Sequence, residues 1–274
     1  MIASPLAEGL FHKAISQSGY VSSYSAEYAE SISELSSKNI FAEDIKYLTD
    51  SNEIVDYLQG LTQTEVYEKY IATAEKYVYP ITPITMRDGI VVPKEGVYKA
   101  LEKADPDLIV VAGTNKDEMN YWFVNSEYFY DTSFEIRRTL KRSEANLRSW
   151  NKYRSAIWRY KGAEEPLRRM SKSNDNLYSY RLDWDEEDDG IFGDYSLFVG
   201  AAHGIDVPFI SNSFDMEQIP WYIKNILFPE SSAEGRDALS SLMMRYWGNI
   251  AKYGDPNVFV SQKWDKFTAN DNQM

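Results

Sequence analysis

The sequence of 274 residues contains no cysteine and only two histidines, His12 and His203. The lack of cysteine excludes disulfide bonds, thiolate nucleophiles and cysteine-ligated zinc sites. It leaves the cellular compartment open, because cysteine-free proteins occur in oxidising and in reducing environments. Any chemistry that needs an imidazole therefore depends on one of two side chains.

Long hydrophobic runs and an excess of positive charge are also absent. No apolar segment approaches the roughly 18 residues that a membrane-spanning helix needs, and residues 1–10 lack the charged and apolar regions of a secretory signal. Lys and Arg together number 29 against 42 Asp and Glu, which gives a formal net charge of −13. Because phosphate backbones and anionic lipids require clustered cations, we expect neither nucleic acid nor a membrane as a partner.

Strand-like segments occur at three places in the chain. Residues 14–17 lead toward a glycine, residues 108–112 form a continuous apolar run rich in β-branched side chains, and residues 177–184 alternate in polarity. The continuous run is typical of a strand that is covered on both faces in a parallel sheet. The alternating segment is typical of a strand with one buried face.

Helical patterns fill most of the chain between these segments. Residues 25–77 and 133–172 have helical spacing, and apolar side chains form a stripe over residues 239–250. Thr62 and Glu65 have the spacing of a capping box, which predicts the start of a helix. Strands separated by long helices, in a chain with 43% hydrophobic residues, favour a globular α/β architecture.

Two loops are candidates for a functional site. In α/β sheets, functional groups collect just past the carboxyl ends of the strands. The turn after residues 108–112 carries Asp117 and Glu118, and the loop after residues 177–184 leads to His203. A carboxylate from one loop can orient the imidazole of the other by a hydrogen bond. From spacing alone, a structural histidine and a solvated turn remain open as the alternative.

Two clusters of charge are further candidates for binding sites. The acidic stretch 185–190 fits the first positions of an EF-hand loop, but position twelve is Ser196, where calcium binding requires a glutamate. We therefore expect a solvated surface loop without a metal. The many Lys and Arg of residues 133–172 are interrupted by glutamates and spread around helical turns, which indicates a solvated helix face. No G-x-S-x-G elbow and no glycine-rich phosphate loop occurs in the sequence.

Five motifs in sequence order resemble one known family. They are SPLAEGLFHKAISQSG, DGIVVP, AGTNKDE, GAAHGIDVPF and YWGNIAKYGDPN. Their order is similar to that of type-B carboxylesterases, the cholinesterase-like branch of the α/β-hydrolases, and the resemblance runs nearly end to end. It implies that residues 1–274 form a single partial domain, the C-terminal part of an α/β-hydrolase fold with parallel strands, flanking helices and an incomplete sheet.

The resemblance also implies roles for individual side chains. In the family a Ser-Glu-His triad cleaves carboxylic esters, and its acid and base fall on Glu118 and His203. Ser18 resembles a hydroxyl that hydrogen-bonds the acid. Asp206 stands where the family usually carries a glutamate in a supporting role. A catalytic His203 would explain the small residues around it at 200–204, because glycine and alanine leave room around the imidazole and let the loop turn sharply.

Other parts of the family pattern are not found in these 274 residues. The nucleophile elbow and the oxyanion loop of the family precede SPLAEGLFH, so a missing N-terminal segment is an expected partner. The substrate would be a small ester, and no cofactor or metal is implied. Residues 123–175 would form a helical insertion that borders the site, and Tyr121, Trp122 and Phe209 would line a pocket or belong to the core. The alternative is a non-catalytic binding or adhesion module with the same fold.

Overall fold

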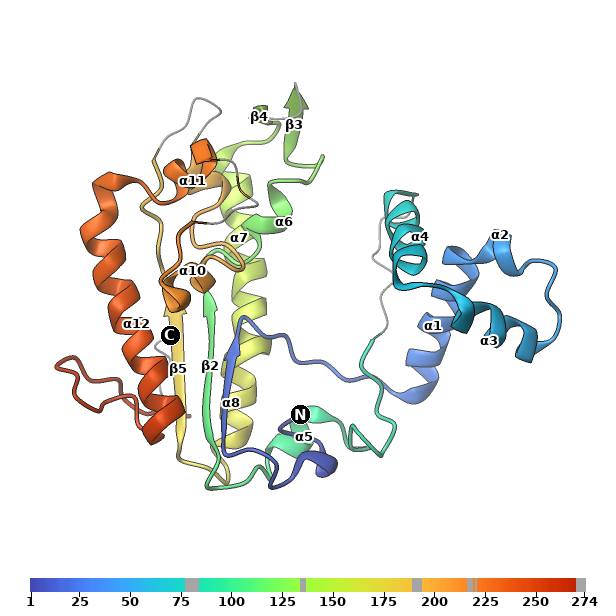
Figure 1. Cartoon of the computed structure of the whole chain (residues 1–274), viewed down its shortest axis with the longest axis horizontal. Helices are drawn as coiled ribbons and strands as arrows, with labels where there is room; N and C mark the ends of the chain where they lie inside the picture. Colours follow the sequence, from blue (N-terminus) through green and yellow to red (C-terminus); the bar gives the residue numbers. More distant parts are fainter. Residues whose placement is uncertain (77–83, 134–136, 189–193, 216–218, 220, 270–274) are drawn as a thin grey trace. The chain divides into compact units, whose positions relative to one another are not determined.

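The computed structural model describes residues 1–76, 84–133, 137–188, 194–215, 219 and 221–269 (Figure 1). The chain divides into two compact units. The first is chiefly Ser22–Val97, and the second is chiefly Ala7–Val21 together with Tyr98–Met274. The assignment of residues 1–274 to a single partial domain stays a prediction.

The first unit is helical, as the pattern over residues 25–77 predicted. Its helices are α1 (Ala26–Ile40), α2 (Ala42–Ile45), α3 (Ser51–Gly60) and α4 (Gln63–Lys76). The predicted capping box is complete: the Thr62 N–H donates to Glu65 Oε2 at 2.8 Å, and the Glu65 N–H donates to Thr62 Oγ1 at 3.3 Å. Asp50 caps α3 in a related way, since its Oδ1 accepts from the N–H of Asn52 at 2.7 Å.

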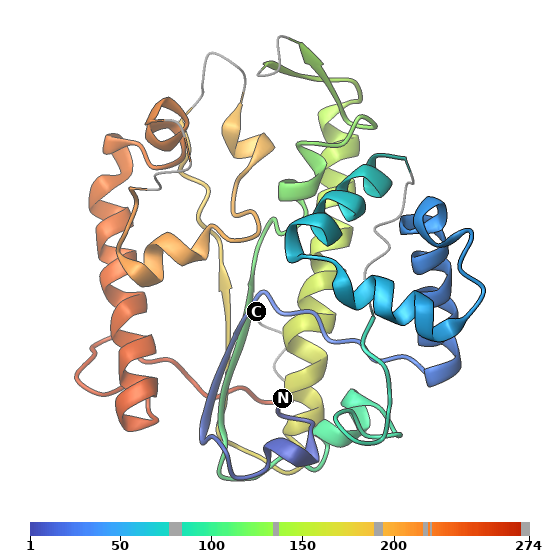
Figure 2. The same ribbon diagram turned by 45° about the vertical axis from the view of Figure 1, so that its right-hand side comes forward.

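The second unit is built on a parallel sheet of three strands in the order β1-β2-β5 (Figure 2). The strands are β1 (Lys13–Gln17), β2 (Ile109–Asn115) and β5 (Leu177–Leu182). They confirm the predicted strand segments. β2 extends past the predicted Ala112 because it continues to pair with β5, with Gly113 opposite Tyr180. A side chain at Gly113 would collide with the Tyr180 ring, since an added Cβ would lie 2.1 Å from it.

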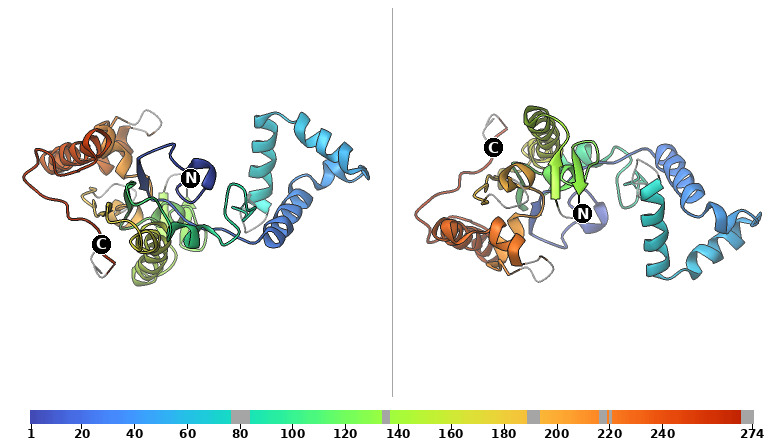
Figure 3. Two further views of the ribbon diagram at one scale, coloured as in Figure 1. Left: turned by 90° about the horizontal axis from the view of Figure 1, so that it is seen from below. Right: turned by 90° about the horizontal axis from the view of Figure 1, so that it is seen from above.

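Helices cover both faces of this sheet. One face carries α7 (Glu144–Arg159) and α8 (Glu165–Met170), joined by the π-helical turn η2 (Tyr160–Glu164), and the other carries α12 (Ala233–Tyr253) (Figure 3). The stripe predicted within residues 239–250 lies on α12, where Met243, Tyr246 and Ile250 are buried. No helix in the described parts of the chain is both long and apolar enough to cross a membrane.

The prediction of helix over residues 133–172 is wrong at its start. β3 (Tyr130–Ser133) and β4 (Arg137–Leu140) form an antiparallel pair, with Tyr130 opposite Leu140. The helix begins only at Glu144, because the Ser143 side chain caps it by accepting from the Asn146 N–H at 3.3 Å. Pairing with residues that precede the segment therefore overrode its helical spacing.

Short helices complete the second unit. They are α5 (Val97–Leu101), which begins at the last residue of the first unit, α6 (Asn120–Phe123), α9 (Tyr195–Phe198), α10 (Asp206–Ser211) and α11 (Trp221–Leu227). The turns η1 (Pro5–Ala7) and η3 (Glu230–Ser232) are 3-10 helices. α6 follows the β2 turn and α10 follows the loop of His203, so both flank the candidate site. The expectation that residues 123–175 border that site as an insertion stays a prediction.

Candidate active site

The carboxyl ends of β1 and β2 bring Ser18 and Glu118 into contact. The Ser18 N–H donates to the Gly113 carbonyl at 2.8 Å, which continues the strand pairing by one bond. Ser18 then adopts a φ of +50°, an uncommon conformation for a residue with a side chain. In this conformation its hydroxyl donates a hydrogen bond to Glu118 Oε1.

Glu118 is held by its own turn and by the histidine loop. Its Oε1 also accepts from the Asn115 N–H at 2.7 Å, and the side chain is 0% exposed. Its Oε2 lies 2.7 Å from His203 Nδ1. The backbone supports this contact, because the Asp117 N–H donates to the Ala201 carbonyl at 2.9 Å and joins the two loops. The carboxylate thus has one oxygen fixed and the other aimed at the imidazole.

This geometry determines which nitrogen of His203 is available for chemistry. With the proton on Nδ1 donated to Glu118, the neutral ring presents Nε2 as an acceptor. The His203 side chain is 35% exposed, whereas Glu118 is fully enclosed. An exposed imidazole that is oriented by a buried carboxylate can act as a general base toward a group that approaches from solvent.

The small residues around His203 have the predicted effect on the loop. Gly200 and Gly204 have φ values of +50° and +87°, which favour glycine. At Gly200 an added Cβ would lie 2.9 Å from the Ser196 carbonyl oxygen. Ala201 and Ala202 are buried, so larger side chains there would displace the loop.

Asp206 connects residues of β1, β2 and β5 by hydrogen bonds next to the Glu118–His203 pair. Its Oδ2 accepts from Gln17 Nε2 at 2.8 Å and from the Tyr180 hydroxyl at 3.2 Å, and its Oδ1 accepts from Asn115 Nδ2 at 3.4 Å. Burial, followed by the nearby Asp206 charge, raises the pKa of Tyr180 far above its ordinary value, so Tyr180 stays a donor. Asn115 links this cluster to the histidine loop through the Ala202 carbonyl at 2.8 Å.

Three aromatic rings surround the imidazole. Their centroids lie 6.3 Å (Tyr121), 5.2 Å (Trp122) and 5.4 Å (Trp158) from that of His203. Tyr121 and Trp122 are 56% and 40% exposed, so they form an accessible aromatic surface beside His203. Trp158 was missed by sequence reasoning because it lies inside the helical pattern of α7. Its indole N–H donates to the Ser18 carbonyl at 3.1 Å.

Phe209 does not belong to this surface. It is fully buried on α10, with its ring centroid 5.0 Å from Trp184 and 6.1 Å from Phe228. The sequence left open whether Phe209 lines a pocket or belongs to the core, and the structure places it in the core with Trp184 and Phe228. Packing there fixes the helix that follows the histidine loop.

The acidic stretch 185–190, described as far as Asp188, is only partly the solvated loop that the sequence predicted. Asp185 is exposed and pairs with Lys116 at 2.7 Å. Glu187 differs, because both of its carboxylate oxygens are buried and have no hydrogen-bond partner among the described residues. Burial raises the pKa of Glu187 to about 8. Within the described ranges, no group of three or more His, Asp or Glu side chains could hold a metal ion.

Comparisons with known proteins identify the family. The model of the carboxylesterase family matches residues 1–157 and 127–274. Carboxylesterase 1D of Mus musculus is 23% identical over 313 residues, which cover 100% of this chain and 52% of the relative. Neuroligin-2 of Mus musculus is 24% identical over 335 residues, which cover 100% of this chain and 37% of the relative.

Solved structures show the same fold. A pNB esterase matches with a TM-score of 0.67 at 18% identity, over 97% of this chain and 53% of that one. The carboxylesterase of Geobacillus stearothermophilus matches with a TM-score of 0.64 at 19% identity, over 97% of this chain and 55% of that one. The chain thus spans about half the length of the carboxylesterases it matches. It belongs to the type-B carboxylesterase family and has part of the α/β-hydrolase fold.

Proposed function

We propose that this chain supplies the acid and the base of an ester-hydrolysing Ser-Glu-His triad. The observation that carries the proposal is the 2.7 Å contact between Glu118 Oε2 and His203 Nδ1, made by a carboxylate that is fully buried and fixed on its other oxygen. His203 Nε2 takes the proton of a serine hydroxyl as that hydroxyl attacks the ester carbonyl. Glu118 then stabilises the imidazolium, and His203 passes the proton to the leaving alcohol, which leaves an acyl-enzyme. Water, deprotonated by His203 as it attacks, cleaves the acyl-enzyme and releases the carboxylic acid and the free serine.

The serine in this proposal comes from outside the 274 residues. The sequence has no G-x-S-x-G elbow, and β1 is at the edge of the described sheet. A further strand that pairs with β1 would satisfy its open backbone groups and would deliver a residue to the strand end that carries Ser18. The same added segment would supply the backbone N–H groups that stabilise the oxyanion of the tetrahedral intermediate.

The aromatic surface supports an apolar substrate group. Tyr121 and Trp122 are exposed beside His203. When a ligand covers large apolar rings, the burial of their surface makes the free energy of binding more favourable. We propose that the rings of Tyr121 and Trp122 contact the acyl or the alcohol part of the ester. In contrast, Phe209 has no exposed surface to offer.

The proposal is tested with 4-nitrophenyl butyrate and a serine-reactive fluorophosphonate. The chain alone is expected to show neither serine-dependent hydrolysis nor labelling, because loss of a nucleophile typically lowers turnover by about 10⁶-fold. A protein in which a segment with the G-E-S-A-G serine precedes this chain is expected to do both. There, His203→Ala lowers kcat by ~10⁴- to 10⁶-fold, and His12→Ala is the matched control. Fluorophosphonate labelling of a serine in the chain alone would contradict the proposal.

The alternative function is a non-catalytic binding module of the same family. The match to neuroligin-2 fits this alternative. It predicts that the longer protein neither reacts with the fluorophosphonate nor hydrolyses the ester, and that Glu118→Gln affects only stability. The assay above therefore separates the two functions.

A further inference from the structure

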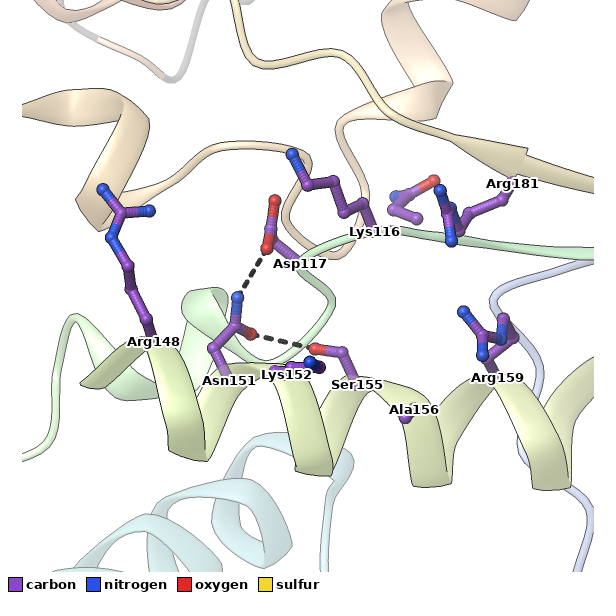
Figure 4. A pocket seen from close by; sticks show the side chains of 10 residues that line it. Lys116, Asp117, Arg148, Asn151, Lys152, Ser155, Ala156, Arg159 and Arg181 are labelled. Atoms are coloured by element: carbon purple, nitrogen blue, oxygen red, sulfur yellow. Dashed lines mark hydrogen bonds between the residues drawn. The ribbon is translucent and has the colours of Figure 1, made fainter. Parts of the chain in front are cut away.

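A pocket of about 420 Å³ lies between α7 and the carboxyl ends of β2 and β5, outside the Glu118–His203 pair (Figure 4). Its lining includes five cationic side chains, which are Lys116, Arg148, Lys152, Arg159 and Arg181. The sequence predicted that the charges of residues 133–172 are spread around helical turns. Three of these charges, on Arg148, Lys152 and Arg159, lie along the pocket, because residues four and seven apart return to one side of a helix.

The floor of the pocket is a connected set of hydrogen bonds. Asn151 Nδ2 donates to Asp117 Oδ1 at 2.6 Å, and the Ser155 hydroxyl donates to Asn151 Oδ1 at 2.9 Å (Figure 4). The Met119 N–H donates to Ser155 Oγ at 3.2 Å. These hydrogen bonds join α7 to the turn after β2, so the backbone that carries the cations is held in one position.

Arg181 is engaged by Asp183 through both Nε and Nη2, but the cations on α7 keep capacity for a ligand although two of them have acidic neighbours. Lys116 pairs with Asp185, and Arg148 and Arg159 use Nε for Glu144 and Glu164 at 2.6 and 2.8 Å. A guanidinium has five N–H donors, so one Nε contact leaves others for a second anion. In the described part of the chain, no carboxylate lies within ion-pair distance of Lys152. Figure 4 shows Arg148 and Arg159 rising from α7 on either side of Asn151 and Ser155.

We propose that this pocket binds a small multivalent oxyanion that carries phosphate or carboxylate groups. Several cations that converge on a concave surface attract a compact anion more strongly than single surface charges do. Arginine pairs with phosphate and carboxylate by two parallel hydrogen bonds, which favours these groups over halide. The chain as a whole carries a net charge of −13, so it does not attract anions in general, and binding here is a property of the pocket. This site is independent of the proposed ester hydrolysis.

The test is calorimetric titration of the whole chain with pyrophosphate and, in a second arm, with citrate, both at constant ionic strength. We expect saturable binding at one site for at least one of them, and the stronger ligand identifies the preferred group. Lys152→Gln and Arg148→Gln are each expected to weaken binding about tenfold, the loss for one charge-assisted contact. Arg154→Gln is the matched control, because Arg154 lies on α7 but is not part of the pocket lining.

Three results of the titrations would overturn the proposal. They are the absence of saturable binding in both arms, an equal weakening by Arg154→Gln and Lys152→Gln, and unchanged binding in both pocket variants. A measurement on the unmodified chain avoids any effect of mutation on folding. Pyrophosphate is expected to shift the backbone amide NMR signals of the turn at Lys116 and of α7 around Asn151. Shifts confined to other parts of the chain would also refute the site.

Discussion

Glu187 is expected to make the folded chain less stable as the pH rises through neutrality. Its carboxyl oxygens are buried without a partner among the described residues, and burial raises its pKa from 4.5 to about 8. In the unfolded chain the same group ionises near its ordinary value. Between these two values the folded state therefore holds a proton that the unfolded state releases, and each step up in pH favours unfolding.

The size of the effect follows from the two pKa values. Below pH 4.5 both states are protonated and Glu187 carries no penalty, and above about pH 8 the penalty is complete. Within this window the slope is at most about 1.4 kcal/mol per pH unit. The full interval corresponds to an upper limit of ~5 kcal/mol, which partial access of water reduces to on the order of 3 kcal/mol.

The assay is urea unfolding of the chain at several pH values between 5 and 8. Glu187→Gln replaces the carboxyl with a neutral group of the same shape, so its stability is expected to depend less on pH than that of the unmodified chain. Glu186→Gln is the matched control, because Glu186 is the adjacent residue and is exposed. Parallel pH profiles of the free energy of unfolding for the unmodified chain and Glu187→Gln would refute the reasoning. So would an unmodified chain whose free energy of unfolding rises with pH while that of Glu187→Gln does not.

Two further substitutions, Ser18→Ala and Gly113→Ala, test the contacts that hold the site, and Gly235→Ala is the control for the second. Ser18→Ala removes a donor from the buried Glu118 carboxylate and should lower the free energy of unfolding by about 1–3 kcal/mol in urea; a loss below ~0.5 kcal/mol would contradict the role of this bond. Gly113→Ala places a Cβ 2.1 Å from the Tyr180 ring and should destabilise the chain by about 3 kcal/mol or more, whereas Gly235→Ala, with nothing within 4 Å on α12, should stabilise it slightly. Equal effects of Gly113→Ala and Gly235→Ala on the melting temperature would refute the steric argument.

Periodicity and local signals predicted the main elements of the fold. The continuous apolar run at residues 108–112 predicted a strand, and the capping box at Thr62 predicted the start of a helix. Both patterns are local, and the structure contains both features. The β3–β4 pair was missed, because strands of four residues are too short to give a clear alternating pattern beside the helical spacing that follows them.

The candidate site was predictable only in part, because contacts between loops that are distant in sequence are not encoded in the spacing of either loop. The residue types and the strand-end positions of Glu118 and His203 suggested their contact, but spacing alone favoured a structural histidine and a solvated turn. The bond from the Trp158 indole to the Ser18 carbonyl had no signal, since an aromatic residue inside a helix pattern normally indicates packing. Glu187 was misread because acidic residues in a run are normally solvated, and only the three-dimensional path of the loop buries this one.

The central claim is that Glu118 keeps a proton on Nδ1 of His203 and leaves Nε2 as the accepting nitrogen. A two-bond ¹H–¹⁵N NMR correlation spectrum of the imidazole rings, recorded with the rings neutral, measures this tautomer directly. Only His12 and His203 contribute, and His12→Ala assigns the signals. We expect His203 to be protonated at Nδ1, and Glu118→Gln to produce a mixture of tautomers. A proton on Nε2 of His203 in the unmodified chain would contradict the account.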